Sequence, residues 1–343
     1  MEHLRQDDPA RIGPYVPLAR LDERDGGHPV PDRRYIARSA DGERTVLVCV
    51  PRAAADPSRW AEEVRHARRS SVPRFLPVSD AAEAAGGQVP DGVGPTPWYA
   101  APYTPALVLP AALAAHGGPL PERFVRAWGA ALAHSLAAAH AQGVTHAGVS
   151  PSAVLLMADG PWLAGFGAVR AAGPDGLRRP DLAGLEPAAL APEQLSGGLP
   201  RPLGDVYGLG TVLSYASTGQ VVPENGELPA ALRSVITACL ARDPAARPTA
   251  ARVAAELTRG TGAAPASATS RVLPASQAPH ASPAPQAPSA PQATVLDGVF
   301  PVPLPPRVLA ELARHSAAVL AAELPGPPIP AVPVGPVARN GRG

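Results

Sequence analysis

Apolar and polar residues follow regular patterns along most of the first 260 positions. Residues 35–50, YIARSADGERTVLVCV, predict two strands joined by a turn at Asp41-Gly42. Residues 58–69 place apolar side chains at helical spacing opposite a charged face, which predicts an amphipathic helix. Residues 1–30 are polar and rich in turn formers, and residues 70–110 are broken by prolines, so the second stretch fits short strands and turns.

From about residue 120 the pattern becomes helical. A long helix is predicted to start near Pro121 and to stop at Gly143. A second hairpin is predicted within 149–167, and three further helices over 205–217, 228–241 and 248–258. A small β-rich first part followed by a larger helical part favours an α+β domain with two lobes.

The composition changes after about residue 260. The Ala/Pro-rich stretch that follows cannot bury a core, so we expect a disordered linker. A helix is predicted over 305–325, with Leu309, Leu312, Val319 and Leu320 roughly on one face. We favour packing of this helix against the main domain over a role as a partner-binding helix. The predicted divisions are a first lobe (11–105), a second lobe (106–260), a linker (261–296) and a tail (297–343) with a helix at about 306–324.

Charge and cysteine content narrow the classes of function. The net charge of +1 argues against a protein that binds nucleic acid or a membrane surface by electrostatics. The chain has no lysine, so all 30 basic residues are arginines. Cys49 and Cys239 are isolated, which excludes a zinc cluster and fits a reducing cytoplasm. No apolar run is long enough to span a membrane and the charged start is no signal peptide, so we expect a cytoplasmic protein.

Five segments carry the most specific signal. They are HAQGVTHAGVSPSAVLL (140–156), LAGFGAVR (163–170), LAPEQLSG (190–197), GDVYGLGTVL (204–213) and CLARDPAARPT (239–249). In this order they resemble the catalytic loop and later motifs of the bacterial, actinobacterial-type Ser/Thr protein kinase family. The resemblance covers about residues 11–260 and implies a bilobal protein-kinase-like fold.

The resemblance implies structural roles for six residues. Asp205 would brace the catalytic loop, and Glu193 and Arg247 would form a buried ion pair that ties the activation segment to the second lobe. His146 and Phe166 match the His of the catalytic loop and the Phe of the D-F-G segment. Glu63 matches the helix carboxylate that normally pairs with a lysine, so here it is expected to be solvated or paired with an arginine.

The positions that would carry out phosphoryl transfer depart from the family pattern. Transfer needs a phosphate-binding lysine, magnesium ligands and a carboxylate that orients the attacking hydroxyl. The matching positions hold Cys49, Gly148, Ser150, Ala153 and Gly165. The segment 21–35, where a glycine-rich loop would fall, keeps only Gly26 and Gly27. Asp175 and Asp181 could approach a metal only by rearrangement.

Two further features concern regulation and access to the cleft. Ala147 replaces the arginine that reads an activation-loop phosphate, and no Ser, Thr or Tyr lies between Ala168 and Leu190. Phe166, Trp162 and the segment 21–35 are the candidates for blocking the adenine site.

These observations lead to a first hypothesis with two alternatives. We expect a catalytically inactive, kinase-like domain (a pseudokinase and not an enzyme) that acts as a signalling scaffold or regulatory binding module. Its partner would be a protein, with an active kinase as one candidate, and no cofactor, metal or nucleic acid is implied. One alternative is a metal-independent nucleotide or ligand sensor that binds ATP weakly without magnesium. The other is a Ser/Thr protein kinase with ATP binding and residual activity.

Overall fold

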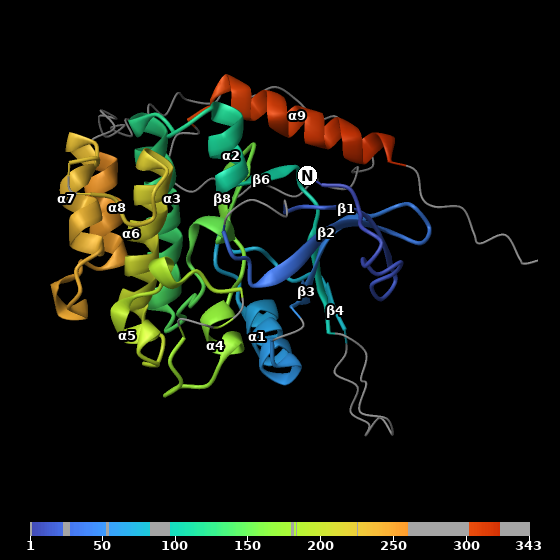
Figure 1. The fold of residues 1–343 in the computed structure, drawn as a ribbon, viewed down its shortest axis with the longest axis horizontal. Coiled ribbons are helices and arrows are strands. Elements are labelled where there is room, and N and C mark those ends of the chain that lie inside the picture. The colour runs from blue at the N-terminus through green and yellow to red at the C-terminus, as the bar shows by residue number, and fades with distance from the viewer. Residues whose placement is uncertain are drawn as a thin grey trace, which may run out of the picture.

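The computed structural model divides the chain into a small first lobe built on a sheet and a larger helical second lobe (Figure 1). It describes residues 2–22, 28–52, 55–82, 97–179, 182, 184–224, 226–259 and 302–322. The predicted α+β architecture with two lobes is confirmed. The predicted linker (261–296) and all of the tail other than 302–322 lie outside the described residues.

The first lobe is a five-stranded antiparallel sheet with one helix against it. The strands, in the spatial order β1-β2-β3-β5-β4, are β1 (Tyr15–Arg20), β2 (Asp32–Ser39), β3 (Thr45–Pro51), β5 (Tyr99–Pro102) and β4 (Asp80–Ala81). The predicted hairpin is confirmed as β2 and β3, and Gly42 in its turn has a positive φ of 82°. The predicted helix is confirmed as α1 (Pro57–Arg69), which begins where the Asp56 side chain accepts from the backbone N–H groups of Ser58 and Arg59.

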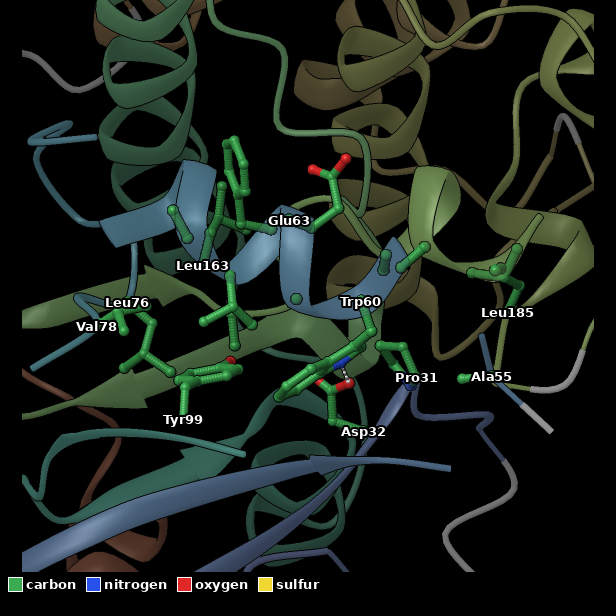
Figure 2. Close-up of a pocket in the computed structure, with 18 residues that line it drawn as sticks. Pro31, Asp32, Ala55, Trp60, Glu63, Leu76, Val78, Tyr99, Leu163 and Leu185 are labelled. Atoms are coloured by element: carbon green, nitrogen blue, oxygen red, sulfur yellow. Dashed lines mark hydrogen bonds between the residues drawn. The ribbon is translucent and has the colours of Figure 1, made fainter. Parts of the chain in front are cut away.

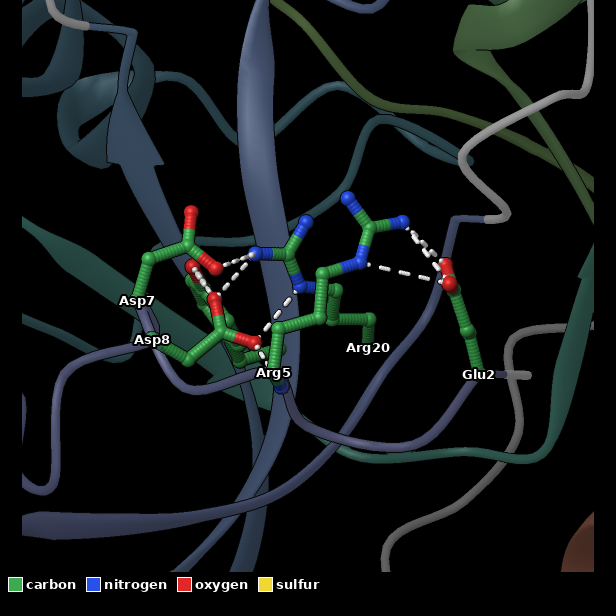
Figure 3. Close-up of polar contacts among 6 residues, drawn as sticks. Glu2, Arg5, Asp7, Asp8 and Arg20 are labelled. Atoms are coloured by element: carbon green, nitrogen blue, oxygen red, sulfur yellow. Dashed lines mark hydrogen bonds and ion pairs between the residues drawn. The ribbon is translucent and has the colours of Figure 1, made fainter.

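The start of the chain is pinned to this sheet by ion pairs, which Figure 3 shows. Asp8 accepts from Arg20 at 2.7 Å and from the Tyr35 hydroxyl at 2.7 Å, while Arg5 pairs with Glu2 at 2.7 Å. Burial would raise the pKa of Asp8, but these hydrogen bonds lower it to about 2. The prediction of a polar, turn-rich start was wrong for residues 15–20. These residues form β1, which pairs with β2 and buries Tyr15 and Ala19.

The second lobe is built around long helices that pack on a three-stranded sheet. Its elements are β6 (Ala106–Val108), α2 (Leu109–His116), α3 (Glu122–Ala141), β7 (Val154–Met157), β8 (Gly160–Leu163), α4 (Ala168–Ala172), α5 (Pro192–Leu195), α6 (Pro202–Thr218), α7 (Ala230–Cys239) and α8 (Ala250–Arg259). The four predicted helices and the second hairpin are confirmed as α3, α6, α7, α8 and β7–β8. No helix among the residues that the structure describes is long and apolar enough to cross a membrane.

The last described helix, α9 (Pro306–Ala321), lies across both lobes, from α2 toward β1 and β2 (Figure 1). Val308 and Leu312 enter the core of the second lobe, and Val319 enters the apolar cluster that includes Ile36 and Leu47 of the first lobe. Arg38 donates to the carbonyls of Val319 and Ala322 at 2.9 Å, which satisfies backbone groups at the end of the helix. The favoured prediction of a helix packed on the domain is confirmed.

The predicted apolar face of α9 was wrong in part. Leu309 and Leu320 are 51% and 78% exposed, whereas Val308, Leu312 and Val319 are buried. The buried positions are separated by four and seven residues and therefore follow the helical repeat more closely than the predicted set.

The burial of α9 gives a stability prediction with a matched control. We expect Leu312→Ala to lower the free energy of unfolding by about 2–4 kcal/mol, because it leaves a cavity in the core of the second lobe. The same substitution at exposed Leu309 should change it by no more than about 0.5 kcal/mol. Denaturant unfolding of the full chain measures both, and equal effects would contradict the packing of α9.

Candidate functional site

The loop that matches a kinase catalytic loop is fastened to α6 by one carboxylate. Asp205 is 2% exposed and accepts from the backbone N–H groups of His146 and Ala147, both at 2.8 Å. His140, at the end of α3, lies 2.9 Å from the same carboxylate through Nε2. Charged hydrogen bonds to buried backbone groups are strong, so Asp205 fixes the position of the loop relative to α6. His140 was not among the predicted residues.

His146 packs between two phenylalanines. Its ring centroid is 4.7 Å from that of Phe75 and 5.7 Å from that of Phe166, with both pairs nearly perpendicular. The imidazole is fully buried, and neither ring nitrogen has a hydrogen-bond partner among the described residues. Burial, with Arg170 and His140 in addition, lowers the pKa of His146 to about 4 against the opposing effect of Asp205. The histidine therefore acts as a neutral packing group that joins the catalytic-loop segment to the D-F-G-like segment.

Two glycines meet where the family carries two aspartates. A Cβ added at Gly148 would lie 2.0 Å from the carbonyl oxygen of Gly165, far closer than van der Waals contact. Gly165 itself has a positive φ of 72°, a conformation that L side chains rarely adopt. The two loops touch through their backbones, so this arrangement leaves no room for a side chain at 148.

The other replaced positions are packed into the structure. Cys49 is fully buried on β3, where burial raises the pKa of its thiol and keeps it uncharged. Ser150 precedes a short 3-10 turn, and its Oγ lies 3.2 Å from the Oγ of Ser152. Ala153 is buried in the same turn and its carbonyl accepts from the N–H of Ala164 at 2.9 Å.

The α1 carboxylate is paired with an arginine, which is one of the two arrangements expected from the sequence. Arg170 of α4 donates to both oxygens of Glu63, at 2.8 Å and 2.6 Å. A Cβ at Gly167 would lie 2.2 Å from Glu63 Oε2, so the pair sits directly over this glycine. Arg170 also lies over the Phe166 ring, 5.2 Å from its centroid. The identity of the arginine could not be read from sequence spacing, because 107 positions separate the partners.

Residues 28–32 of the first lobe lie against the second lobe at the mouth of the cleft. The Pro29 carbonyl accepts from Ser152 Oγ at 2.8 Å, and His28 lies 3.1 Å from the Glu186 carboxylate. Pro31 borders the cavity beside Gly148, and its ring lies 3.6 Å from the place of a Cβ on Gly165.

The same segment is also fixed from the first-lobe side. The Val30 carbonyl accepts from Arg52, and Asp32 accepts from the Trp60 indole at 2.7 Å, which Figure 2 shows. Three candidates for blocking the cleft were predicted. Of these, the described part of the segment 21–35 is the one that borders the cavities at both Gly148 and Gly165, through Pro31. Trp162 instead donates to Asp159 at 3.1 Å, and Phe166 packs on His146. Gly26 and Gly27 lie outside the described residues.

Little space remains beside the two glycines, whereas a cavity of about 520 Å³ lies elsewhere between the lobes, bordered by His28, Val30 and Ser152. The cavities that adjoin Gly148 and Gly165 measure about 20 and 30 Å³, enough for a few water molecules at most. Leu21, Leu47 and Leu155 of the two lobes are buried in one apolar cluster. Gly148, Ala153 and Gly165 offer no side-chain oxygen to a metal ion, so the residues present do not fit ATP with magnesium.

The segment after α4 is tied down by two arginines. Arg247 donates to both oxygens of Glu193, at 2.6 Å and 2.8 Å, and also to three backbone carbonyls. Burial would raise the pKa of Glu193, but Arg247 holds it below its usual value. The pair is less enclosed than expected, because the Glu193 side chain is 31% exposed.

Arg179 was not predicted. It is fully buried and donates to the carbonyls of Gln194 and Gly198 at 2.8 Å. Asp175 was predicted to approach a metal only by rearrangement, and it pairs with Arg179 at 3.1 Å. Asp181, the other such residue, lies outside the described residues.

The contact between the two glycines gives the first prediction for this site. We expect Gly148→Ala to lower the free energy of unfolding by roughly 2–3 kcal/mol, because backbone has to move to admit the methyl group. Gly226→Ala is the control, since a Cβ at 226 meets nothing within 4 Å. Denaturant unfolding decides between them, and a Gly148→Ala variant as stable as the wild type would show that the loops are not in contact.

The buried histidine gives a prediction about pH. Because the folded pKa of His146 is about 4 and the ordinary value is 6.5, only the unfolded chain binds this proton between those values. Wild-type stability should therefore lose a contribution on the order of 2 kcal/mol as the pH falls from 7 to 5. His146→Phe cannot take up the proton, so the difference between variant and wild type should grow in the variant's favour by that amount. Denaturant unfolding at both pH values measures it, and a difference that stays constant would contradict the prediction.

Comparison with known proteins identifies relatives of the chain by sequence and by structure. No protein-family profile matches the chain. A probable serine/threonine-protein kinase, PkwA of Thermomonospora curvata, is 34% identical over 278 residues, which cover 75% of this chain and 35% of the relative. The serine/threonine-protein kinase AfsK of Streptomyces coelicolor is 31% identical over 75% of this chain and 33% of its own length. The chain thus spans about a third of the length of these relatives.

Solved structures show the same fold. The kinase domain of Mycobacterium tuberculosis PknI matches with a TM-score of 0.53 at 22% identity, over 73% of this chain and 97% of the solved one. A double mutant of that domain matches with a TM-score of 0.55 at 21% identity, over 76% and 100%.

These relatives correct one expectation. The prediction that the chain is not an enzyme is contradicted, because the relatives are named as serine/threonine-protein kinases and point to a family of enzymes. The chain belongs to the bacterial, actinobacterial-type Ser/Thr protein kinase family.

Proposed function

We propose that this domain serves Ser/Thr kinase signalling as a regulatory binding module that a protein partner recognises. The kinase names of its relatives support a place in phosphorylation signalling. A second protein is the proposed ligand, with an active kinase of the same family as the first candidate. Because a fold alone does not determine a function, the proposal depends on the site.

The observation that carries the proposal is the seating of residues 28–32 on the second lobe. This segment bonds to Ser152, faces Glu186 and borders the glycine contact, so the two lobes present one continuous surface. The ion pairs Arg247–Glu193 and Arg170–Glu63 hold neighbouring segments of the second lobe and α1 in place. A preformed surface costs less conformational entropy on binding, which favours recognition by a partner.

A metal-independent nucleotide sensor is the second candidate. A nucleotide whose phosphates reached Gly148 and Gly165 would have to displace residues 28–32, because the cavities beside these glycines hold only about 20 and 30 Å³. The third candidate, a Ser/Thr kinase with residual activity, would need the same opening and a set of residues other than those at the five replaced positions.

A thermal-shift experiment separates the candidates. For the closed domain we expect 1 mM ATP, with magnesium or with EDTA, to move the melting temperature by less than about 1 °C, because a ligand that hardly binds the folded state hardly stabilises it. A rise that is independent of magnesium would favour the nucleotide sensor. Phosphosite mapping after incubation with ATP and magnesium adds a direct assay of transfer, and incorporation suppressed by an adenine-site inhibitor would favour the third candidate.

Partner binding needs its own measurement. Titration of the full chain into active kinase domains from the same organism should give a saturable complex and change the rate at which one of them phosphorylates a peptide. If none of them binds and none changes its rate, the proposal of a kinase partner fails.

A further inference from the structure

The last turn of α1 borders a cavity that lies apart from residues 28–32. It measures about 380 Å³, and its other walls come mainly from the loop that follows α3 and from α4, which packs beside α1 (Figure 1). It shares no residue with the cavity of about 520 Å³ and only Phe166 with the small cavities beside Gly148 and Gly165. It is therefore a separate site, outside the closed cleft.

The rim of this cavity is basic. Four of the last five residues of α1 are Arg65, His66, Arg68 and Arg69, and two of them, His66 and Arg69, border the cavity. Arg69 is exposed, and it has no hydrogen bond or ion pair to another described residue. No Asp or Glu is among the described residues that line the cavity. An anion would therefore meet a cationic side chain without competition from a lining carboxylate.

Arg170 adds a second guanidinium from α4. Three of its N–H groups donate to Glu63 and to the Thr145 carbonyl, which hold the group in place at the cavity wall. A guanidinium has further N–H donors that these bonds leave open. Because Glu63 offsets the charge of Arg170, this arginine contributes hydrogen-bond donors, and Arg69 contributes the positive charge.

The remaining walls suit a ligand that is part polar and part apolar. The Ser70 hydroxyl at the end of α1 is buried and has no hydrogen-bond partner among the described residues, so a ligand oxygen that paired with it would satisfy this group. Val144 and Phe166 line the cavity and pack against the core of the second lobe. They offer apolar surface to a side chain that lies next to the anionic group.

A phosphate uses these groups more fully than a carboxylate does. A phosphorylated side chain carries about −1.5 to −2 charges at pH 7 and three acceptor oxygens, which suits donors that come from two helices. Arginine side chains recur in sites that recognise phosphorylated residues. The activation segment of this chain cannot supply the phosphate, because no Ser, Thr or Tyr lies between Ala168 and Leu190.

We propose that this cavity binds a phosphorylated serine or threonine of a protein partner. The inference rests on the proposed role in partner binding and adds the chemical group that the partner presents. Ala147 stands where the family reads a phosphate on its own activation segment, and it does not line the cavity, so the two sites are different.

Two peptide pools test the preference for phosphate. One fluorescein-labelled pool has phosphoserine or phosphothreonine at its centre between random residues, and the matched pool has the unmodified residue there. We expect fluorescence polarisation to show saturable binding of the phosphorylated pool to the full chain, roughly tenfold tighter than binding of the unmodified pool. Equal binding of the pools, or no saturable binding of the phosphorylated one, would overturn the proposal. Inorganic phosphate that displaces the labelled pool as well as unlabelled phosphorylated peptides do would also overturn it, because the site would then recognise free phosphate.

Two matched substitutions then locate the bound phosphate. Arg69→Gln removes the unpaired guanidinium at the cavity, and we expect a loss of affinity for the phosphorylated pool of roughly fivefold or more. Arg68→Gln removes the same charge from the neighbouring exposed position, which does not line the cavity, and should leave the affinity within about twofold. Both side chains are exposed, so both variants should fold, which circular dichroism checks. If the two variants bind the pool equally, the proposal fails.

Titration with active kinase domains separates this inference from the proposed function. A kinase domain that binds the wild-type chain should bind roughly tenfold more weakly after phosphatase treatment, and Arg69→Gln should weaken the complex as well. If treatment and substitution both leave binding unchanged, the partner role stands and the phosphate site fails. If no kinase domain binds, the proposed kinase partner fails, and the peptide pools still decide whether the cavity binds phosphate.

Discussion

The hydrogen bonds of the Asp205 carboxylate are the interactions on which the arrangement of the loops at the cleft depends. The carboxylate accepts hydrogen bonds from two backbone N–H groups of the loop at 146–147 and lies against His140. One buried carboxylate therefore joins α6, this loop and the end of α3. That position brings His146 under Phe75 and Phe166 and sets Gly148 against Gly165. Removing one partner of a buried charged group leaves the others without compensation, so these contacts form as a unit.

The close contact of the two loops requires glycine at positions 148 and 165, in the middle of the cleft. Backbone contact at Gly148 and Gly165 draws the two loops together, and Pro31 fills the space above them. Glu63, whose counterpart in the family pattern pairs with a lysine, is paired with Arg170 instead. The closed cleft is thus one connected set of contacts and not the result of a single blocking side chain.

The parts of the fold that follow local patterns could be predicted from the sequence. The β2–β3 hairpin, α1 and α3 each carry their signal within a few residues, and the motif order gave Glu193 and Arg247 as neighbours 54 positions apart. The contact between His28 and Glu186 could not be predicted, because these residues are 158 positions apart and no sequence motif connects them. The helix α2 escaped detection since it has eight residues and starts at a proline-containing turn, and the face of α9 was misjudged because it depends on which lobe surface the helix meets.

The position of α9 has a consequence for where the domain ends. Its Val308 and Leu312 complete the core of the second lobe, and its carboxyl end is held by Arg38 of the first. The folded unit is therefore discontinuous along the chain, with residues 302–322 as much a part of it as any strand. A chain cut after α8, at the boundary that the kinase motifs suggest, would leave an apolar surface on both lobes uncovered.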